Sequence, residues 1–263
     1  MCRTFLEKNE IFFKTLVYIL VSITTIVLLF QANKISDTQV QIMEQQSKIQ
    51  KYQQTPSIFA KVELVLDPIT NKYTNDSLVI YNDGAPLHYF SDYSAIFFEM
   101  QYGKKGTEIQ KILIPILDYY QNTFYTGNRI DKIMHLTAQH NNETQIKAQN
   151  DLMSYANSND YYGLLQVKRY LEIKYYDKFN EEHIEYHYID PIVGGGMIEN
   201  PPVTKNAVIA LIELHRQAQL RNIGVSLYEV TPALLINKYE IAKEVYREYP
   251  LIEKFLGWQR PYK

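Results

Sequence analysis

No charged residue stands between Lys14 and Lys34, and the residues between them are mostly apolar. A helix over this window is about 28 Å long at 1.5 Å per residue, close to the roughly 30 Å hydrocarbon core of a bilayer. The sequence therefore predicts a transmembrane helix over residues 11–33, after an N-terminal tail of residues 1–10. The expected membrane-anchor positions are Thr15, Leu16, Val17, Leu20, Val21, Ile26, Leu28, Leu29 and Phe30.

A cleaved signal peptide is the alternative interpretation of this segment. The apolar stretch is longer than the usual core of a signal peptide, and no small-x-small cleavage site follows it. We therefore expect an uncleaved, single-pass signal anchor. Arg3, Lys8 and Lys14 precede the segment, whereas Lys34 alone follows it closely. The positive-inside rule then predicts a cytoplasmic N-terminus and a body outside the cell membrane.

Residues 34–55 are rich in Gln, Lys and Ser and contain neither Gly nor Pro, which predicts a helical stalk that ends at Pro56. Ile35, Ile42 and Ile49 are spaced seven apart, as in a parallel coiled coil. The facing heptad positions are mostly polar, so two interpretations stay open. One is a solvated spacer, and the other is weak self-association through the three isoleucines.

The pattern changes after Pro56 to short runs of strand-forming residues separated by Gly, Asn, Asp and Pro turns. Such spacing is typical of a β-sandwich. We expect an α+β protein whose residues 56–200 form an antiparallel, β-sandwich-like domain. Pro115 has no N–H for a ladder and places its strand at a sheet edge or a bulge. The expected strands are 58–66, 77–81, 93–102, 109–117, 164–176 and 183–189.

Helices are expected in two places. Apolar residues at helical spacing predict a helical insertion at about 129–155, as one long or two short helices. A Gly-rich loop with Gly194–Gly196 leads to C-terminal helices, residues 201–263, packed on the sandwich. Thr231 with Pro232 predicts a helix start, Pro250 opens a last short helix, and Gly257 stands where that helix would end.

Composition excludes several classes of function. The formal charge of −2 provides no basic surplus for nucleic acid. The only cysteine is Cys2, so the body has neither a disulfide nor a thiolate metal site. The body also lacks Gly-x-Ser-x-Gly and Ser-x-x-Lys nucleophile motifs. The triple glycine lacks the residues of a phosphate-binding loop. We expect no cofactor and no nucleic-acid partner.

His183, Glu185 and His187 are the sequence's candidates for a metal site. On a strand, the two histidines lie roughly 13 Å apart and cannot share one ion. We therefore expect these three residues on a solvated sheet face, with Ile184, Tyr186 and Tyr188 turned toward the core. A metal-assisted hydrolase that draws further ligands from elsewhere is the alternative.

The chain has 23 tyrosines, several of them in pairs. Because tyrosine is enriched at interfaces, we expect a candidate recognition surface formed by Tyr119, Tyr120, Tyr125, Tyr161 and Tyr162. With no catalytic set in the sequence, the favoured function is a non-catalytic binding or assembly module on a membrane anchor. Its expected partners are the lipid bilayer and another protein or a second copy of the chain. An oligomerising membrane effector or sensor is a further alternative.

Overall fold

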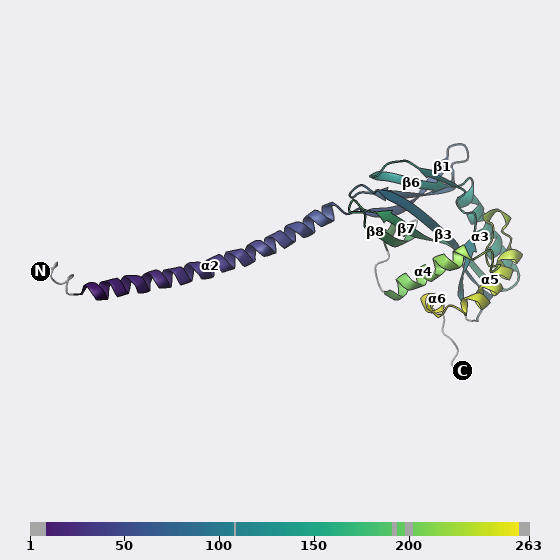
Figure 1. Ribbon diagram of the computed structural model, residues 1–263. Helices are drawn as coiled ribbons and strands as arrows, with labels where there is room; N and C mark the ends of the chain where they lie inside the picture. The colour runs from purple at the N-terminus through teal and green to yellow at the C-terminus, as the bar shows by residue number, and fades with distance from the viewer. Residues whose placement is uncertain (1–8, 108, 191–193, 198–201, 258–263) are drawn as a thin grey trace. The chain divides into compact units, whose positions relative to one another are not determined.

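A computed structural model of the protein describes residues 9–107, 109–190, 194–197 and 202–257 (Figure 1). The chain divides into two compact units, Met1–Gln54 and Thr55–Lys263. The first unit is helical, and the second combines antiparallel strands with helices. The predicted α+β class, with a long N-terminal helix and C-terminal helices, is confirmed.

Helix α2 runs without interruption from Glu10 to Gln53. Within the described residues it is the helix long and apolar enough to cross a membrane by length and composition. Hydroxyl groups in its apolar part donate to the carbonyl four residues earlier, as Thr15 does to Ile11 and Ser22 to Tyr18. Such internal bonds leave few polar hydrogens exposed to an apolar surrounding. The helix ends just before Pro56, as the sequence predicts.

The described residues of the second unit form nine strands in one hydrogen-bonded sheet, ordered β4-β3-β7-β8-β9-β1-β2-β6-β5. Each of the strand pairs is antiparallel. The strands are β1 (Ile58–Asp67), β2 (Lys72–Asn82), β3 (Tyr89–Lys104), β4 (Lys111–Ile116), β5 (Asn122–Tyr125), β6 (Asp131–Thr137), β7 (Tyr161–Tyr176), β8 (Glu182–Asp190) and β9 (Gly194–Met197). All six expected strands are present, and β4 with Pro115 is an edge strand as predicted.

Short β9 links two four-stranded groups, β4-β3-β7-β8 and β1-β2-β6-β5. Its contact with β1 is a single pair, Ala60 opposite Gly195. The sequence predicts a Gly-rich loop here. That prediction is wrong at Gly194–Met197, because these residues form a strand that pairs with β8. Glycine has a low strand propensity, so composition alone could not indicate this pairing.

Two apolar cores fill the second unit. One contains Leu78 and Ile80 from β2 together with Leu171 and Ile173 from β7, so both strand groups contribute to it. The other joins β3 and β4 to the helices, which gather beside β3 in Figure 1. The helices are α3 (Asn141–Ser158), α4 (Pro202–Arg216), the short 3₁₀ helix η1 (Leu227–Glu229), α5 (Pro232–Tyr246) and α6 (Pro250–Phe255).

The ends of the C-terminal helices follow the sequence prediction. The Thr231 hydroxyl accepts a hydrogen bond from the Leu234 N–H at 3.2 Å and caps α5. Pro250 is at the start of α6. Gly257 follows that helix with φ of 77°, in the left-handed region that favours glycine.

Helix α5 covers the free edge of β4. The Tyr239 hydroxyl donates to the Gln110 carbonyl at 3.1 Å, and the Tyr246 hydroxyl donates to the Leu113 carbonyl. An uncovered strand edge invites pairing with other chains, and side-chain bonds to its backbone reduce that hazard.

The predicted helical insertion at 129–155 is half wrong. Residues Asp131–Thr137 form strand β6, and the helix α3 begins only at Asn141. A β-bulge causes the misleading pattern, because Ile80 pairs with Met134 while Tyr81 pairs with Lys132. Ile133 is the extra residue, so it and Met134 are both buried. Two adjacent buried residues break the alternation of a strand and imitate helical spacing.

The start of the second unit is held by the Asn82 side chain. Its amide oxygen accepts from the Ser57 N–H at 2.9 Å and the Gly84 N–H at 3.0 Å. Its amide nitrogen donates to the carbonyls of Ala85 and Arg129. A Cβ at Gly84 would lie 2.5 Å from the Ser57 nitrogen, so only glycine fits this close approach. Asn82 is fully buried and all of its hydrogen-bonding capacity is used.

A buried ion pair joins the two strand groups. The Arg169 guanidinium of β7 donates to the Asp76 carboxylate of β2 at 2.5 Å, and both side chains are at most 3% exposed. The Tyr119 hydroxyl donates to the same carboxylate at 2.6 Å, and Arg169 donates to the Tyr120 hydroxyl at 3.1 Å. The Asn141 side chain, at the start of α3, donates to the other Asp76 oxygen. Removing one partner would leave an uncompensated charge in the interior.

We therefore expect Arg169→Met to lower the free energy of unfolding by about 3–5 kcal/mol, since Asp76 remains buried and unpaired. Urea unfolding of the full-length chain in detergent, followed by tyrosine near-ultraviolet circular dichroism, measures this. The double variant Asp76→Leu with Arg169→Met should recover much of the loss, because it buries no charge.

The exposed pair Arg221–Glu248 provides the matched control. Arg221→Met should cost less than about 1 kcal/mol, as expected of a surface ion pair. A similar cost for Arg169→Met and Arg221→Met would contradict the role assigned to the buried pair.

Candidate functional site

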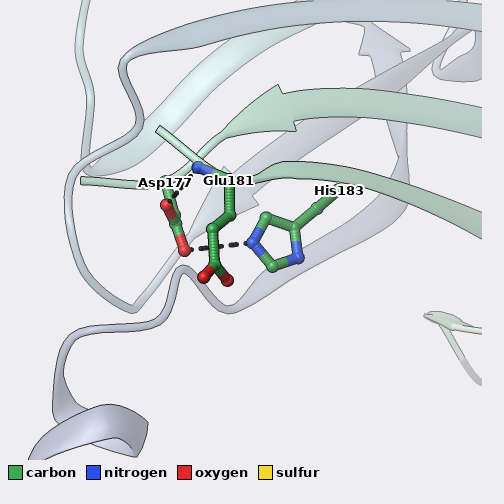
Figure 2. Close-up of side chains that lie close together, drawn as sticks. All are labelled: Asp177, Glu181 and His183. Atoms are coloured by element: carbon green, nitrogen blue, oxygen red, sulfur yellow. Dashed lines mark hydrogen bonds and ion pairs between the residues drawn. The ribbon is translucent and has the colours of Figure 1, made fainter. Parts of the chain in front are cut away.

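The tip of the β7–β8 hairpin brings two acidic residues and a histidine together (Figure 2). One ligand atom from each of Asp177, Glu181 and His183 lies within 4.8 Å of the others. The local turn explains this closeness. The Asp177 N–H donates to the Glu181 carbonyl at 3.1 Å, and Asn180 adopts a left-handed conformation with φ of 61°. Asparagine tolerates that conformation better than most residues do.

The Asp177 carboxylate is used to close this turn. One oxygen accepts from the N–H groups of Phe179 and Glu181, both at 2.9 Å. The other lies 3.1 Å from Nε2 of His183. Burial raises the pKa of Asp177, but the bonds from Glu181, His183 and Phe179 outweigh it and hold the pKa below its ordinary value.

The residue types in this cluster suit a transition-metal ion, since zinc takes histidine nitrogen and carboxylate oxygen. Both oxygens of Asp177, however, already accept hydrogen bonds within the hairpin. Carboxylates that accept nearby N–H bonds are a common way to stabilise tight turns. The cluster is accounted for as a hairpin closure, and we assign no metal to it.

The structure does not bring the three sequence candidates together. His183 is bonded to Asp177, whereas Nε2 of His187 lies 3.1 Å from the Glu185 carboxylate. The Tyr175 hydroxyl also donates to Glu185 at 2.6 Å. Burial raises the pKa of Glu185, but the bonds from His187 and Tyr175 bring it below its ordinary value.

The expectation of a solvated face for these residues is wrong at His187, which is 0% exposed. His187 pairs across the ladder with Leu171, and Glu185 pairs with Ile173. Both β7 residues belong to the core shared by the two strand groups. Ile184, expected to face the core, is 41% exposed. Alternation separated the residues of the two faces, but it assigned the wrong face to solvent at His187 and to the core at Ile184.

The five candidate recognition tyrosines are distributed over different environments. Tyr119 is 1% exposed and belongs to the buried Asp76–Arg169 network, so it contributes nothing to a surface. Tyr120 packs against it in an edge-to-face arrangement. Tyr125 is 60% exposed, and its hydroxyl donates to Asp92. Tyr162 is 38% exposed.

Tyr161 lines an open cavity of about 470 Å³ beside α5. Its ring stacks on that of Tyr102, with centroids 5.1 Å apart and planes at 8°. The other lining residues are Gly103, Gln110, Tyr239, Glu240, Lys243 and Arg247. The basic side chains that line the cavity have acidic neighbours on α5, since Lys243 pairs with Glu240 at 3.8 Å. Aromatic walls with balanced charges suit a neutral polar group or a peptide side chain.

Sequence reasoning found Tyr161 but missed the α5 side of this cavity. Tyr239, Lys243 and Arg247 are four residues apart and therefore share one face of a helix. That spacing was visible in the sequence. The packing of this face beside Tyr102 depends on contacts between segments far apart in the chain, which spacing does not indicate.

Comparisons of the chain with known protein families, with curated proteins and with solved structures find no match. The assignment of function therefore rests on the geometry of the chain itself.

His215 of α4 is a buried titratable group outside these clusters. Its Nε2 lies 3.0 Å from the Ile116 carbonyl oxygen, which can only accept, so Nε2 carries the proton. Nδ1 then accepts from the Tyr93 hydroxyl at 2.9 Å. Burial lowers the pKa of His215 to about 4, and the neighbouring Arg216 acts in the same direction. The folded protein therefore keeps this histidine neutral in mildly acidic solution.

We expect stability to fall as the pH is lowered from 6.5 to about 4. In this window the unfolded chain binds a proton at His215 and the folded chain does not, so the loss approaches about 3 kcal/mol. Urea unfolding at a series of pH values measures it. His215→Phe should be less dependent on pH between these limits, whereas the exposed-site variant His88→Gln should match the unsubstituted protein. An unchanged pH dependence in His215→Phe would contradict the assignment.

Proposed function

We propose that the chain is a single-pass, membrane-anchored, non-catalytic protein whose body binds or assembles with another protein close to the bilayer. The observation that carries this proposal is helix α2, whose apolar part is long enough to span a membrane and continues directly into the polar stalk. The sequence bias of basic residues further supports a cytoplasmic N-terminus and an external body.

The body we propose is sandwich-like, with the two four-stranded groups packed on each other. The shared core supports this arrangement, because apolar residues of β1, β2 and β6 cluster with those of β7 and β8. The ion pair between Asp76 and Arg169 supports it as well, since these residues come from different groups. A rigid body of this kind suits a scaffold for recognition better than a mobile one.

We propose that the body is not catalytic, because its His–carboxylate pairs and its buried Arg169 network are already engaged in contacts within the fold. The His–carboxylate pairs of β8 close a hairpin or lie buried in the sheet. The buried Arg169 network is inaccessible to a substrate. The tyrosine-lined cavity beside α5 is an accessible concave feature with aromatic walls, and we propose that it contacts the partner.

The stalk offers a second contact surface. Ile35, Ile42 and Ile49 are 58%, 47% and 56% exposed. An isolated polar helix is marginally stable in water, and packing against another helix would stabilise it. Self-association through this heptad register therefore stays part of the proposal, with a second copy of the chain as the partner at the stalk.

Anchoring is tested by alkaline carbonate extraction of membranes from cells that express the chain. The full-length protein should remain in the membrane pellet. The variant Leu20→Asp with Ile23→Asp should be extracted, because each carboxylate at the centre of the span costs about 2.5–3.5 kcal/mol.

The control is Ile35→Asp with Ile42→Asp, which changes the stalk in the same way and should remain in the pellet. Extraction of the unsubstituted protein, or equal retention of both double variants, would remove α2 as the anchor.

A further inference from the structure

Strand β3 is longer than the strand that covers its outer edge. β4 pairs with Ile96–Gln101 of β3, whereas β7 pairs with the whole of Tyr89–Lys104. β4 ends at Ile116, and the next strand, β5, belongs to the other strand group. Among the described residues, no strand therefore pairs with residues 89–95 of β3 on the side where β4 would continue. An uncovered edge of this kind is a template for a further strand.

The hydrogen-bond pattern shows which backbone groups this open edge presents. In an antiparallel sheet, alternate residues of a strand point their N–H and C=O groups toward one neighbour, and the residues between them point toward the other. The Lys105 N–H donates to the Asp160 carbonyl at 3.3 Å, so the odd-numbered residues of β3 bond to β7. Phe90, Asp92 and Ser94 then face the open side. Their N–H and C=O groups have no hydrogen bond to any other described residue.

Strand β4 supports the same alternation. The Pro115 carbonyl accepts a bond from the Val225 N–H, so the odd-numbered residues of β4 face away from β3. The even-numbered residues of β4 pair with even-numbered residues of β3, as Ile114 does with Phe98. The even-numbered residues of β3 thus point toward the side of β4 along the whole strand.

Exposed aromatic side chains flank the open edge. Tyr89 and Tyr125 are both 60% exposed. The Tyr125 hydroxyl, on β5, donates to the Asp92 carboxylate at 3.1 Å, although no ladder joins β5 to β3 among the described strands. On the opposite face of β3, Tyr89 and Ser91 line an open cavity of about 630 Å³. Alternate side chains of an added strand would lie beside Tyr125 on one face and beside this cavity on the other.

Asp92 sets the charge that an added strand should carry. It is the only charged residue among residues 89–95. Within the part of the chain that the structure describes, its carboxylate accepts from Tyr125 and has no basic partner. Burial raises the pKa of Asp92, and the bond from Tyr125 acts in the opposite direction. A lysine or arginine directly opposite Asp92 would supply the missing partner.

A second copy of the chain fits this edge poorly. Antiparallel pairing of two β3 edges that uses Phe90, Asp92 and Ser94 of both copies places the two Asp92 carboxylates opposite each other. Like charges in that position are destabilising. The edge therefore favours a strand from a different protein.

We propose that the open edge of β3, residues 89–95, binds an extended segment of another protein as an additional strand, with a basic side chain opposite Asp92. Strand addition to a free sheet edge is a recurring mode of peptide recognition, in which backbone bonds supply affinity and side chains supply specificity. This contact depends on neither the anchor nor the cavity beside α5.

Backbone amide exchange in the full-length chain, held in detergent micelles and resolved to single residues by electron-transfer mass spectrometry, tests the proposal. The probe is a synthetic heptapeptide in which valine and threonine alternate on either side of a central lysine. The control peptide has glutamate in place of the lysine. In the free chain, the amides of Phe90, Asp92 and Ser94 should exchange much faster than those of Ser91 and Tyr93, which bond to β7.

The lysine peptide should slow exchange at Phe90, Asp92 and Ser94 and leave Ser91 and Tyr93 unchanged. The glutamate peptide should bind about tenfold more weakly, since a directly opposed pair changes from attraction to repulsion.

The variant Asp92→Asn keeps the shape of the side chain and removes its charge, so the two peptides should bind to it alike. The matched control Glu143→Gln removes an exposed carboxylate from α3 and should keep the difference between the peptides.

Equal binding of the two peptides to the unsubstituted chain, or no protection by the lysine peptide at millimolar concentration, would overturn the proposal. Slow exchange at Phe90, Asp92 and Ser94 in the free chain would mean that the edge is already covered, which also overturns it. If that protection rises with the concentration of the chain, a second copy is the cover.

Discussion

The body of this protein depends on a single charge pair that cannot reach water. Arg169 and Asp76 come from strands in different groups of the sheet, and they meet at 2.5 Å with almost no exposure. Tyr119 and Tyr120 add hydrogen bonds from the segment after β4, and Asn141 adds one from the start of α3. Each of these elements contributes a hydrogen bond to the buried ions. Loss of such a bond is costly, because a buried charge without partners is strongly destabilising. Burial raises the pKa of Tyr119 well above its ordinary value, and Asp76 and Tyr120 act in the same direction while Arg169 opposes them, so the phenol stays neutral and can donate.

The first unit is governed by a different constraint. Helix α2 has no core of its own, and its apolar residues from Leu16 to Phe30 are 43–73% exposed. A helix with apolar residues on every side is stable only in an apolar surrounding. The second unit, in contrast, buries two apolar cores among its described residues.

Much of the local structure could be predicted from the residues. The extent of α2, the six strands, the edge position of Pro115 and the caps at Thr231 and Gly257 follow from period, proline and turn chemistry, which act over a few residues. The failures share a physical origin in contacts between distant segments. The bulge at Ile133 lies in the pairing of β6 with β2, and buried Tyr119 is hydrogen-bonded to Asp76 and Arg169. His187 is buried because a second group of strands shares its face, which alternation along β8 cannot indicate.

The central claim is that an anchored helix carries a separately folded body. Limited trypsin digestion of intact spheroplasts tests it most directly, with mass spectrometry of the released and membrane-bound fragments. The account predicts that cleavage at the stalk residues Lys48 or Lys51 releases one compact fragment that contains residues 55–263, while α2 stays in the membrane. Full protection of the body, digestion of the body before the stalk, or release of α2 with the body would contradict it.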